Sequence, residues 1–183
     1  VLGEALQALV DRHDALRARF EDAEGSLRMR IEAQVRISIE TVSLDDAKGD
    51  DRASDARADA LVQGFVDTRF DLARAPLLRA QLVRLGPQRH RLTLVLHHIV
   101  SDGWSVRLLA RDLSELYRAR LESRTPSLPP LASGYAHYAA WQCERTSDAQ
   151  LAASIGHWRS RLAGLEPLGL PTDRPRSAWV AQA

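Results

Sequence analysis

Alternating apolar and polar residues predict several β-strands in the first half of the chain. Leu27, Met29 and Ile31 alternate with charged residues, and this period of two is typical of a half-buried strand. A turn-forming run at residues 86–89 separates two further candidates, which we therefore expect to form a hairpin. The expected strands cover residues 27–33, 35–44, 77–85 and 90–97.

Apolar residues spaced three, four or seven positions apart predict helices around these strands. The opening stretch places Leu2, Leu6, Leu9, Leu16 and Phe20 on one stripe, so we expect one helix there. This mixture of elements predicts an α+β fold, with a mixed β-sheet covered by helices. Further helices are expected at residues 53–65, 106–121, 133–145 and 148–162, with loops at 45–51 and 70–76.

Composition and charge exclude several classes of protein. The 183 residues are 45% hydrophobic and 27% charged, which is the balance of a globular protein. The formal net charge is +1 and the charges are well mixed, so we expect no nucleic-acid partner. No apolar run approaches the ~20 residues that cross a bilayer, and the single cysteine, Cys143, fits a reducing compartment. We therefore expect a cytoplasmic protein without a membrane partner.

The candidate chemistry lies in the run HHIVSDG at residues 97–103, where an apolar strand is expected to end. Successive side chains of a strand alternate between its faces, so His97 and His98 point in opposite directions if the strand continues through them. One histidine is then expected to do chemistry, and the other to be structural. Histidine titrates near neutral pH and can take a proton from an amine or alcohol nucleophile.

Asp102 and Gly103 follow this pair at the start of a predicted helix. The Asp102 carboxylate could cap the helix N-terminus, or could hold an arginine and brace the loop around His98. Gly103 permits backbone angles or close approaches that a β-carbon would prevent. Two other interpretations stay open, namely a hydrogen-bonded surface histidine and a metal site. No third ligand stands at useful spacing, so we expect no metal.

Residues 97–103 resemble the HHxxxDG signature of the condensation domains of nonribosomal peptide synthetases. Related acyltransferases of the chloramphenicol acetyltransferase-like superfamily share this signature, but further segments resemble condensation-domain motifs in the same order. Ala18 and His137 depart from the threonine and aspartate that are usual in those motifs. The further segments are residues 12–20 (RHDALRARF), 70–79 (FDLARAPLLR), 135–142 (YAHYAAWQ) and 158–175, which contains LPTDRP.

The resemblance implies a domain organisation. The complete family domain has two chloramphenicol acetyltransferase-like lobes, with the active centre in a tunnel between them. Residues 1–166 would form the N-terminal lobe, and residues 167–183 the start of the linker to the second lobe. The chain begins at Val1 without a methionine. We expect a fragment, inactive on its own, that lacks the family's first strand and whose second lobe follows Ala183.

The resemblance also implies a reaction and its partners. An amine on a downstream peptidyl carrier protein attacks an acyl thioester on an upstream one, and an amide forms. Both substrates hang on 4'-phosphopantetheine arms, so we expect no cofactor bound by the domain itself, and an adenylation domain as a further partner. Two other functions stay open: a stand-alone acyltransferase that uses coenzyme A, and a non-catalytic module that binds carrier proteins.

His98 would be the catalytic residue, which accepts the proton of the amine or orients it, while His97 would hydrogen-bond to the scaffold. The other residues of the motif would support His98. Asp102 would brace the loop by pairing with Arg12 or, less favoured, Arg17. Gly103 would keep the tunnel wall free of a side chain, and Trp104 would serve packing rather than catalysis.

Overall fold

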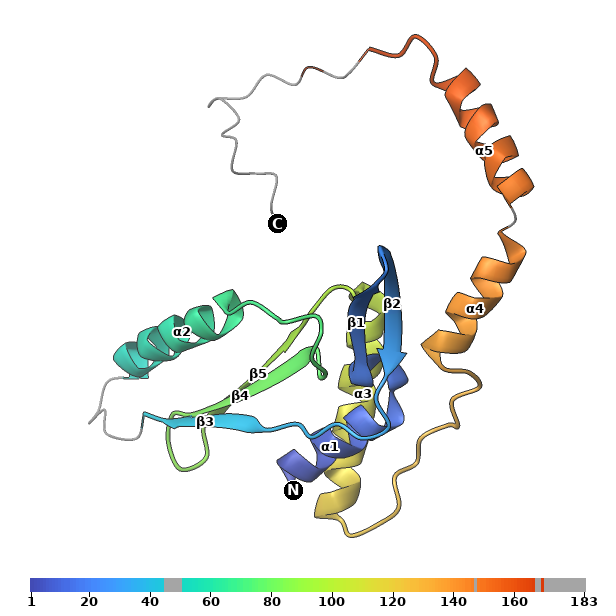
Figure 1. Cartoon of the computed structure of the whole chain (residues 1–183). Coiled ribbons are helices and arrows are strands. Elements are labelled where there is room, and N and C mark those ends of the chain that lie inside the picture. The colour runs from blue at the N-terminus through green and yellow to red at the C-terminus, as the bar shows by residue number, and fades with distance from the viewer. Residues whose placement is uncertain (45–50, 147, 167–168, 170–183) are drawn as a thin grey trace. The chain divides into compact units, whose positions relative to one another are not determined.

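Two small β-sheets lie within the residues that the computed structural model describes, 1–44, 51–146, 148–166 and 169 (Figure 1). One is an antiparallel pair of β1 (Ala18–Ala23) and β2 (Ser26–Ile31). The other has the order β3-β4-β5, and its strands are β3 (Ile39–Ser43), β4 (Leu78–Arg84) and β5 (His90–Leu96). β3 is parallel to β4, while β4 and β5 form the expected antiparallel hairpin. The predicted α+β class with a mixed sheet is confirmed.

Four of the helices lie close to their predicted positions. Helix α2 (Asp51–Asp67) connects β3 to β4, because parallel neighbours need a crossover. Helix α3 (Gly103–Leu121) starts three residues before its predicted start. Helices α4 (Tyr135–Arg145) and α5 (Asp148–Arg161) agree with the prediction within two residues.

The chain divides into two units, Val1–Ala139 and Ala140–Ala183. The first unit contains both sheets and the HHIVSDG run, and the second contains most of α4 and all of α5. Most of the expected loop at 45–51, and residues 167–168 and 170–183 of the expected linker, lie outside the described residues. The expected domain boundary at residue 166 therefore stays a prediction.

The opening stretch differs from its prediction. Helix α1 (Leu2–Arg12) ends before Leu16, because the backbone at His13 is extended, with φ −105° and ψ 106°. A 3-10 turn, η1 (Asp14–Arg17), follows and leads directly into β1. Leu16 is buried as expected, but on this turn, since a turn and a strand can bury apolar residues at the spacing of a helix.

The strand predicted at residues 35–44 is also shorter in the structure, where β3 begins at Ile39. The side chain of Gln7 occupies the backbone groups of the preceding residues. Its Nε2 donates to the carbonyl of Val35 at 2.7 Å, and its Oε1 accepts from the N–H of Ile37 at 3.2 Å. This segment is therefore paired with a glutamine of α1 instead of with a strand, which alternation of side chains cannot reveal.

Packing of α1 against α3 forms the main hydrophobic core of the first unit. Leu6 and Leu9 of α1 are at most 1% exposed, and burying each such side chain contributes about 1.5–3 kcal/mol. Leu113 and Leu116 belong to the same core from α3. This packing holds the C-terminal end of α1 beside α3, where the candidate site is built.

Candidate active site

The two histidines of the HHIVSDG run lie in a turn after β5, which ends at Leu96. The alternation of a strand therefore does not extend to them. The backbone N–H of His97 still donates to the carbonyl of Leu77 at 3.0 Å, and the N–H of Val100 then closes the turn onto the carbonyl of His97 at 3.1 Å. The turn, rather than the strand, sets the directions of the two rings.

His97 is held by the scaffold. Its Nδ1 accepts from the backbone N–H of Ile99 at 3.1 Å, and its ring meets the ring of Phe70 edge-on, with 5.9 Å between centroids. Phe70 in turn lies under the guanidinium of Arg79, at 4.4 Å from its centroid. Arg79 also stacks on Phe65 at 5.1 Å. The His97 ring is therefore held by one hydrogen bond and by this aromatic stack.

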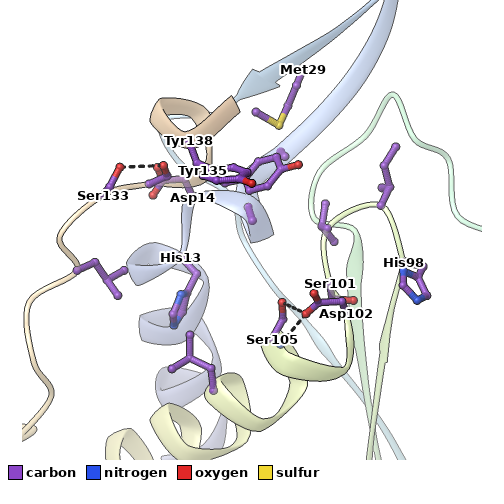
Figure 2. Close-up of a pocket in the computed structure, with 17 residues that line it drawn as sticks. His13, Asp14, Met29, His98, Ser101, Asp102, Ser105, Ser133, Tyr135 and Tyr138 are labelled. Carbon is purple, nitrogen blue, oxygen red and sulfur yellow. Dashed lines mark hydrogen bonds between the residues drawn. The ribbon is translucent and has the colours of Figure 1, made fainter. Parts of the chain in front are cut away.

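His98 is exposed and lines a pocket of about 420 Å³. His97 is not among the residues that line it. Figure 2 shows the pocket, with His98 on the turn that leads to α3 and His13 at the end of α1. Of the two histidines, His98 therefore lines the pocket and His97 does not, and the catalytic role of His98 stays a prediction.

Asp102 caps the N-terminus of α3. Its Oδ1 accepts from the backbone N–H of Ser105 at 2.8 Å and from the Ser105 hydroxyl at 2.7 Å (Figure 2). These two hydrogen bonds lower the pKa of the Asp102 carboxyl below its ordinary value. Of the two roles left open for Asp102, the structure shows the cap.

The expected pairing of Asp102 with an arginine is wrong for the described residues. Arg12 instead donates from Nε to Asp112 of α3 at 3.0 Å, and from Nη2 to the carbonyl of Pro129. Arg17 donates to the backbone carbonyls of Glu32 and Ala33. Arg12 reaches Asp112 and not Asp102, because α1 packs along α3. Asp112 lies ten residues after the N-cap residue Asp102 of that helix.

Asp112 is fully buried and has three partners. Oδ2 accepts from Arg12 and from Nε2 of His13, each at 3.0 Å, and Oδ1 accepts from Arg111 at 2.8 and 3.0 Å. Burial raises the pKa of the Asp112 carboxyl, but the hydrogen bonds from Arg111, Arg12 and His13 outweigh it, so the pKa lies below its ordinary value. Asp112 was not among the residues expected at the site. The signal was its position between Leu109, Leu113 and Leu116 on the buried face of the helix.

The roles expected of Gly103 and Trp104 stay predictions, because few contacts of the two residues lie within the described part of the chain. Gly103 has no positive φ, and a β-carbon there would meet no described atom within 4 Å, so nothing in the described residues requires glycine. Trp104 is 73% exposed and lies under the guanidinium of Arg107 at 5.1 Å. Neither residue packs into the described core.

The other side of the pocket is formed by residues of β2, of the segment before α4 and of the first turn of α4. Met29, Tyr135 and Tyr138 give it an apolar and aromatic lining. Gly134 lies so close to Asp14 that a β-carbon on it would be 1.8 Å from Oδ2 of that carboxylate. The pocket thus has an aromatic side and a polar side, and the polar side carries His98, Asp102 and His13.

Two features are absent from the described residues. No group of three or more His, Cys, Asp or Glu side chains there is arranged to hold a metal ion. Among the same residues, every helix is too short or too polar to span a membrane.

Comparison with known proteins gives the family. The model of the Condensation domain family matches residues 1–181. A linear gramicidin synthase of Brevibacillus parabrevis is 38% identical over 179 residues, which are 96% of this chain but 2% of that protein. The chain therefore spans a small part of this curated relative.

Two solved structures have the same fold over most of the chain. The starter condensation domain of rhizomide synthetase RzmA is 25% identical, with a TM-score of 0.76 over 90% of this chain and 39% of the solved one. The X-domain from teicoplanin biosynthesis, solved in complex with OxyB, is 30% identical, with a TM-score of 0.79 over 97% and 38%. These likenesses confirm the chloramphenicol acetyltransferase-like fold. The chain belongs to the condensation-domain family of nonribosomal peptide synthetases.

Proposed function

We propose that the full-length protein joins an acyl thioester donor to an aminoacyl amine acceptor in nonribosomal peptide synthesis. Both substrates would be carried on 4'-phosphopantetheine arms of upstream and downstream peptidyl carrier proteins, beside an adenylation domain. The single cysteine agrees with a reducing compartment, the cytoplasm. The observation that carries the proposal is an exposed His98 at a pocket, on a turn anchored by His97 and closed by the capped start of α3.

His98 is suited to handle the proton of the attacking amine. The amine nitrogen forms a bond with the thioester carbonyl carbon, the carbon–sulfur bond breaks, and the thiolate leaves. The amine proton passes to His98 and from it to the thiolate, so the histidine is regenerated. No hydrogen bond within the described residues occupies the His98 side chain, which leaves it available to the substrate.

Replacement of His98 tests this function. We expect His98→Ala in the full-length protein to slow amide formation between two loaded carrier proteins by about 10²–10⁴-fold, the usual contribution of a general acid–base group. His90→Ala is a matched control, because His90 is an exposed histidine at the opposite end of β5. Product formed by His98→Ala at the wild-type rate, with both variants folded, would refute the assignment.

A second candidate function is a non-catalytic module that binds a protein partner. The relative solved in complex with OxyB favours it, since that domain has the same fold at 30% identity. The two candidates differ in the effect of His98→Ala. If the protein is a binding module, His98→Ala binds the partner as tightly as the wild type does, and the wild type itself forms no amide. A stand-alone acyltransferase would accept acyl-coenzyme A in place of a loaded carrier protein.

A further inference from the structure

His13 is a second histidine of the pocket, and its orientation is set by a buried carboxylate. It follows α1 and is followed by η1, so it lies at the junction of two elements. Its Nε2 is 3.0 Å from Oδ2 of Asp112, and its side chain is only 11% exposed. Asp112 is further held by Arg12 and Arg111. The ring of His13 therefore has one defined position in the pocket wall.

The contact with Asp112 fixes which nitrogen carries the proton. The Asp112 carboxylate is ionised because two arginines donate to it, so Nε2 of His13 must donate its N–H. Burial, which disfavours the imidazolium, lowers the pKa of His13, and it outweighs the hydrogen bond and charge of Asp112, which raise that pKa. The ring is therefore neutral near pH 7, and Nδ1 holds a lone pair.

Nδ1 is the ring nitrogen of His13 that is left for a substrate, because Nε2 is held by Asp112. No hydrogen bond to Nδ1 is found within the described part of the chain. Among the described residues, the buried side-chain nitrogen and oxygen atoms without a partner are Arg17 Nε, Arg79 Nε and Gln81 Oε1, and Nδ1 of His13 is not one of them. Nδ1 is therefore not both buried and unpartnered, and His13 lines the same pocket as His98 (Figure 2).

We propose that His13 is a substrate-positioning residue, whose Nδ1 accepts a hydrogen bond from an amide N–H of the acyl-pantetheine substrate in the pocket. The proposal rests on the proposed function, because it takes the substrate class from it. His13 and His98 come from different elements, so a chain-like substrate is held at one position while it reacts at another. Asp112 acts through His13, as the group that keeps the acceptor nitrogen directed into the pocket.

Two amide variants separate this role from a structural one. In His13→Asn the side-chain oxygen takes the place of Nδ1, but the side chain no longer reaches Asp112. In His13→Gln the amide can still donate to Asp112, but its oxygen does not coincide with Nδ1. His13→Phe keeps an aromatic ring and removes both interactions. Stability and substrate affinity are thus predicted to change in different variants.

The probe is the pantetheine thioester of N-acetylglycine, whose affinity for the full-length protein is measured by ligand-observed NMR without an acceptor amine. We expect His13→Gln and His13→Phe to raise Kd by about 2- to 10-fold, the net value of one hydrogen bond. His13→Asn should bind nearly as the wild type, although chemical denaturation should show it less stable than His13→Gln. If the loss of affinity across the three variants only parallels their loss of stability, the proposal is overturned. An unchanged Kd in His13→Phe would overturn it as well.

An ester analogue identifies which amide is bound. The thioester of O-acetylglycolic acid replaces the acyl-chain N–H with oxygen and leaves the amides of the pantetheine arm in place. If the acyl chain donates, His13→Gln no longer changes the affinity for this analogue; if the arm donates, the loss persists. If the wild type binds the probe but forms no amide with an acceptor amine, the proposed function is refuted. The Kd values of the His13 variants still decide the proposal made for His13.

Discussion

Asp102 and Asp112 are both carboxylates at α3, yet their surroundings differ. Asp102 is exposed and holds Ser105 at the start of the helix, whereas Asp112 is fully buried among Arg12, His13 and Arg111. The sequence indicated where the pocket histidine and the cap would lie, because both follow from residues close together in the chain. It could not indicate the Asp112 cluster, whose partners Arg12 and His13 are 100 and 99 positions away.

The difference predicts that stability depends on Asp112 more than on Asp102. Asp112→Asn places an NH₂ group among donors and leaves Arg12 and Arg111 without a buried counter-charge, so we expect a loss of about 3–5 kcal/mol in the free energy of unfolding. Asp102→Asn should lose far less, because asparagine is also a good N-cap. Urea denaturation of the two variants makes the comparison, and equal midpoints would contradict it.

The close approach of Gly134 to Asp14 in the pocket wall can be tested by adding one methyl group. A β-carbon there would collide with the Asp14 carboxylate, so Gly134→Ala has to displace one of the two. We expect a loss of about 1 kcal/mol for Gly134→Ala alone, and little further cost for Gly134→Ala in an Asp14→Ala background. A double-mutant cycle from thermal unfolding measures this coupling. Additive losses would show that the two residues do not touch.

At the scale of elements, a strand was predicted correctly where its backbone hydrogen bonds go to a strand nearby in the sequence. β4 and β5 pair with each other across a short turn, and alternation predicted both. β1 was missed because Leu16 and Phe20 continue the spacing of the α1 stripe, although His13 ends that helix. Residues 35–38 were assigned to a strand because alternation reports which side chains are buried, not what the backbone bonds to.

Gln7 is predicted to hold this extended segment to α1. Gln7→Leu removes the donor to Val35 and the acceptor for Ile37 while keeping a similar volume, so we expect a loss of about 1–3 kcal/mol in stability. Hydrogen exchange should locate the effect, since the amide of Ile37 would lose its partner and exchange faster. Gln88→Leu, in the exposed β4–β5 turn, is the control and should leave that amide unchanged. Unchanged exchange at Ile37 in Gln7→Leu would argue against the bridge.

At the scale of the whole molecule, ion pairs between arginines and carboxylates recur along the described part of the chain. The chain has 25 basic and 24 acidic residues, so nearly every carboxylate has a potential partner. Several carboxylates hold their ionised form through arginine, among them Glu21, with Arg30 and Arg19, and Glu115, with Arg124. The net charge of +1 predicts none of these pairs, because they depend on how β1 pairs with β2 and on how the chain turns back after α3.

The Glu115 carboxylate is expected to make the stability of the fold depend on pH in acid. This carboxylate accepts from Arg124 at 2.6 and 3.1 Å and from the backbone N–H of Ser127 at 2.7 Å, and so ties the proline-rich loop to α3. Hydrogen bonds from the Arg124 side chain and then from the Ser127 backbone lower the pKa of Glu115 from 4.5 to about 2. Because the folded-state pKa is the lower one, this contribution to stability is complete above pH 4.5 and is lost as the pH falls toward 2. Chemical denaturation of the full-length protein between pH 6 and 3 gives the free energy of unfolding as a function of pH. We expect this free energy to fall less steeply with falling pH in Glu115→Gln than in the wild type. Equal slopes in both proteins would place the acid sensitivity at other carboxylates.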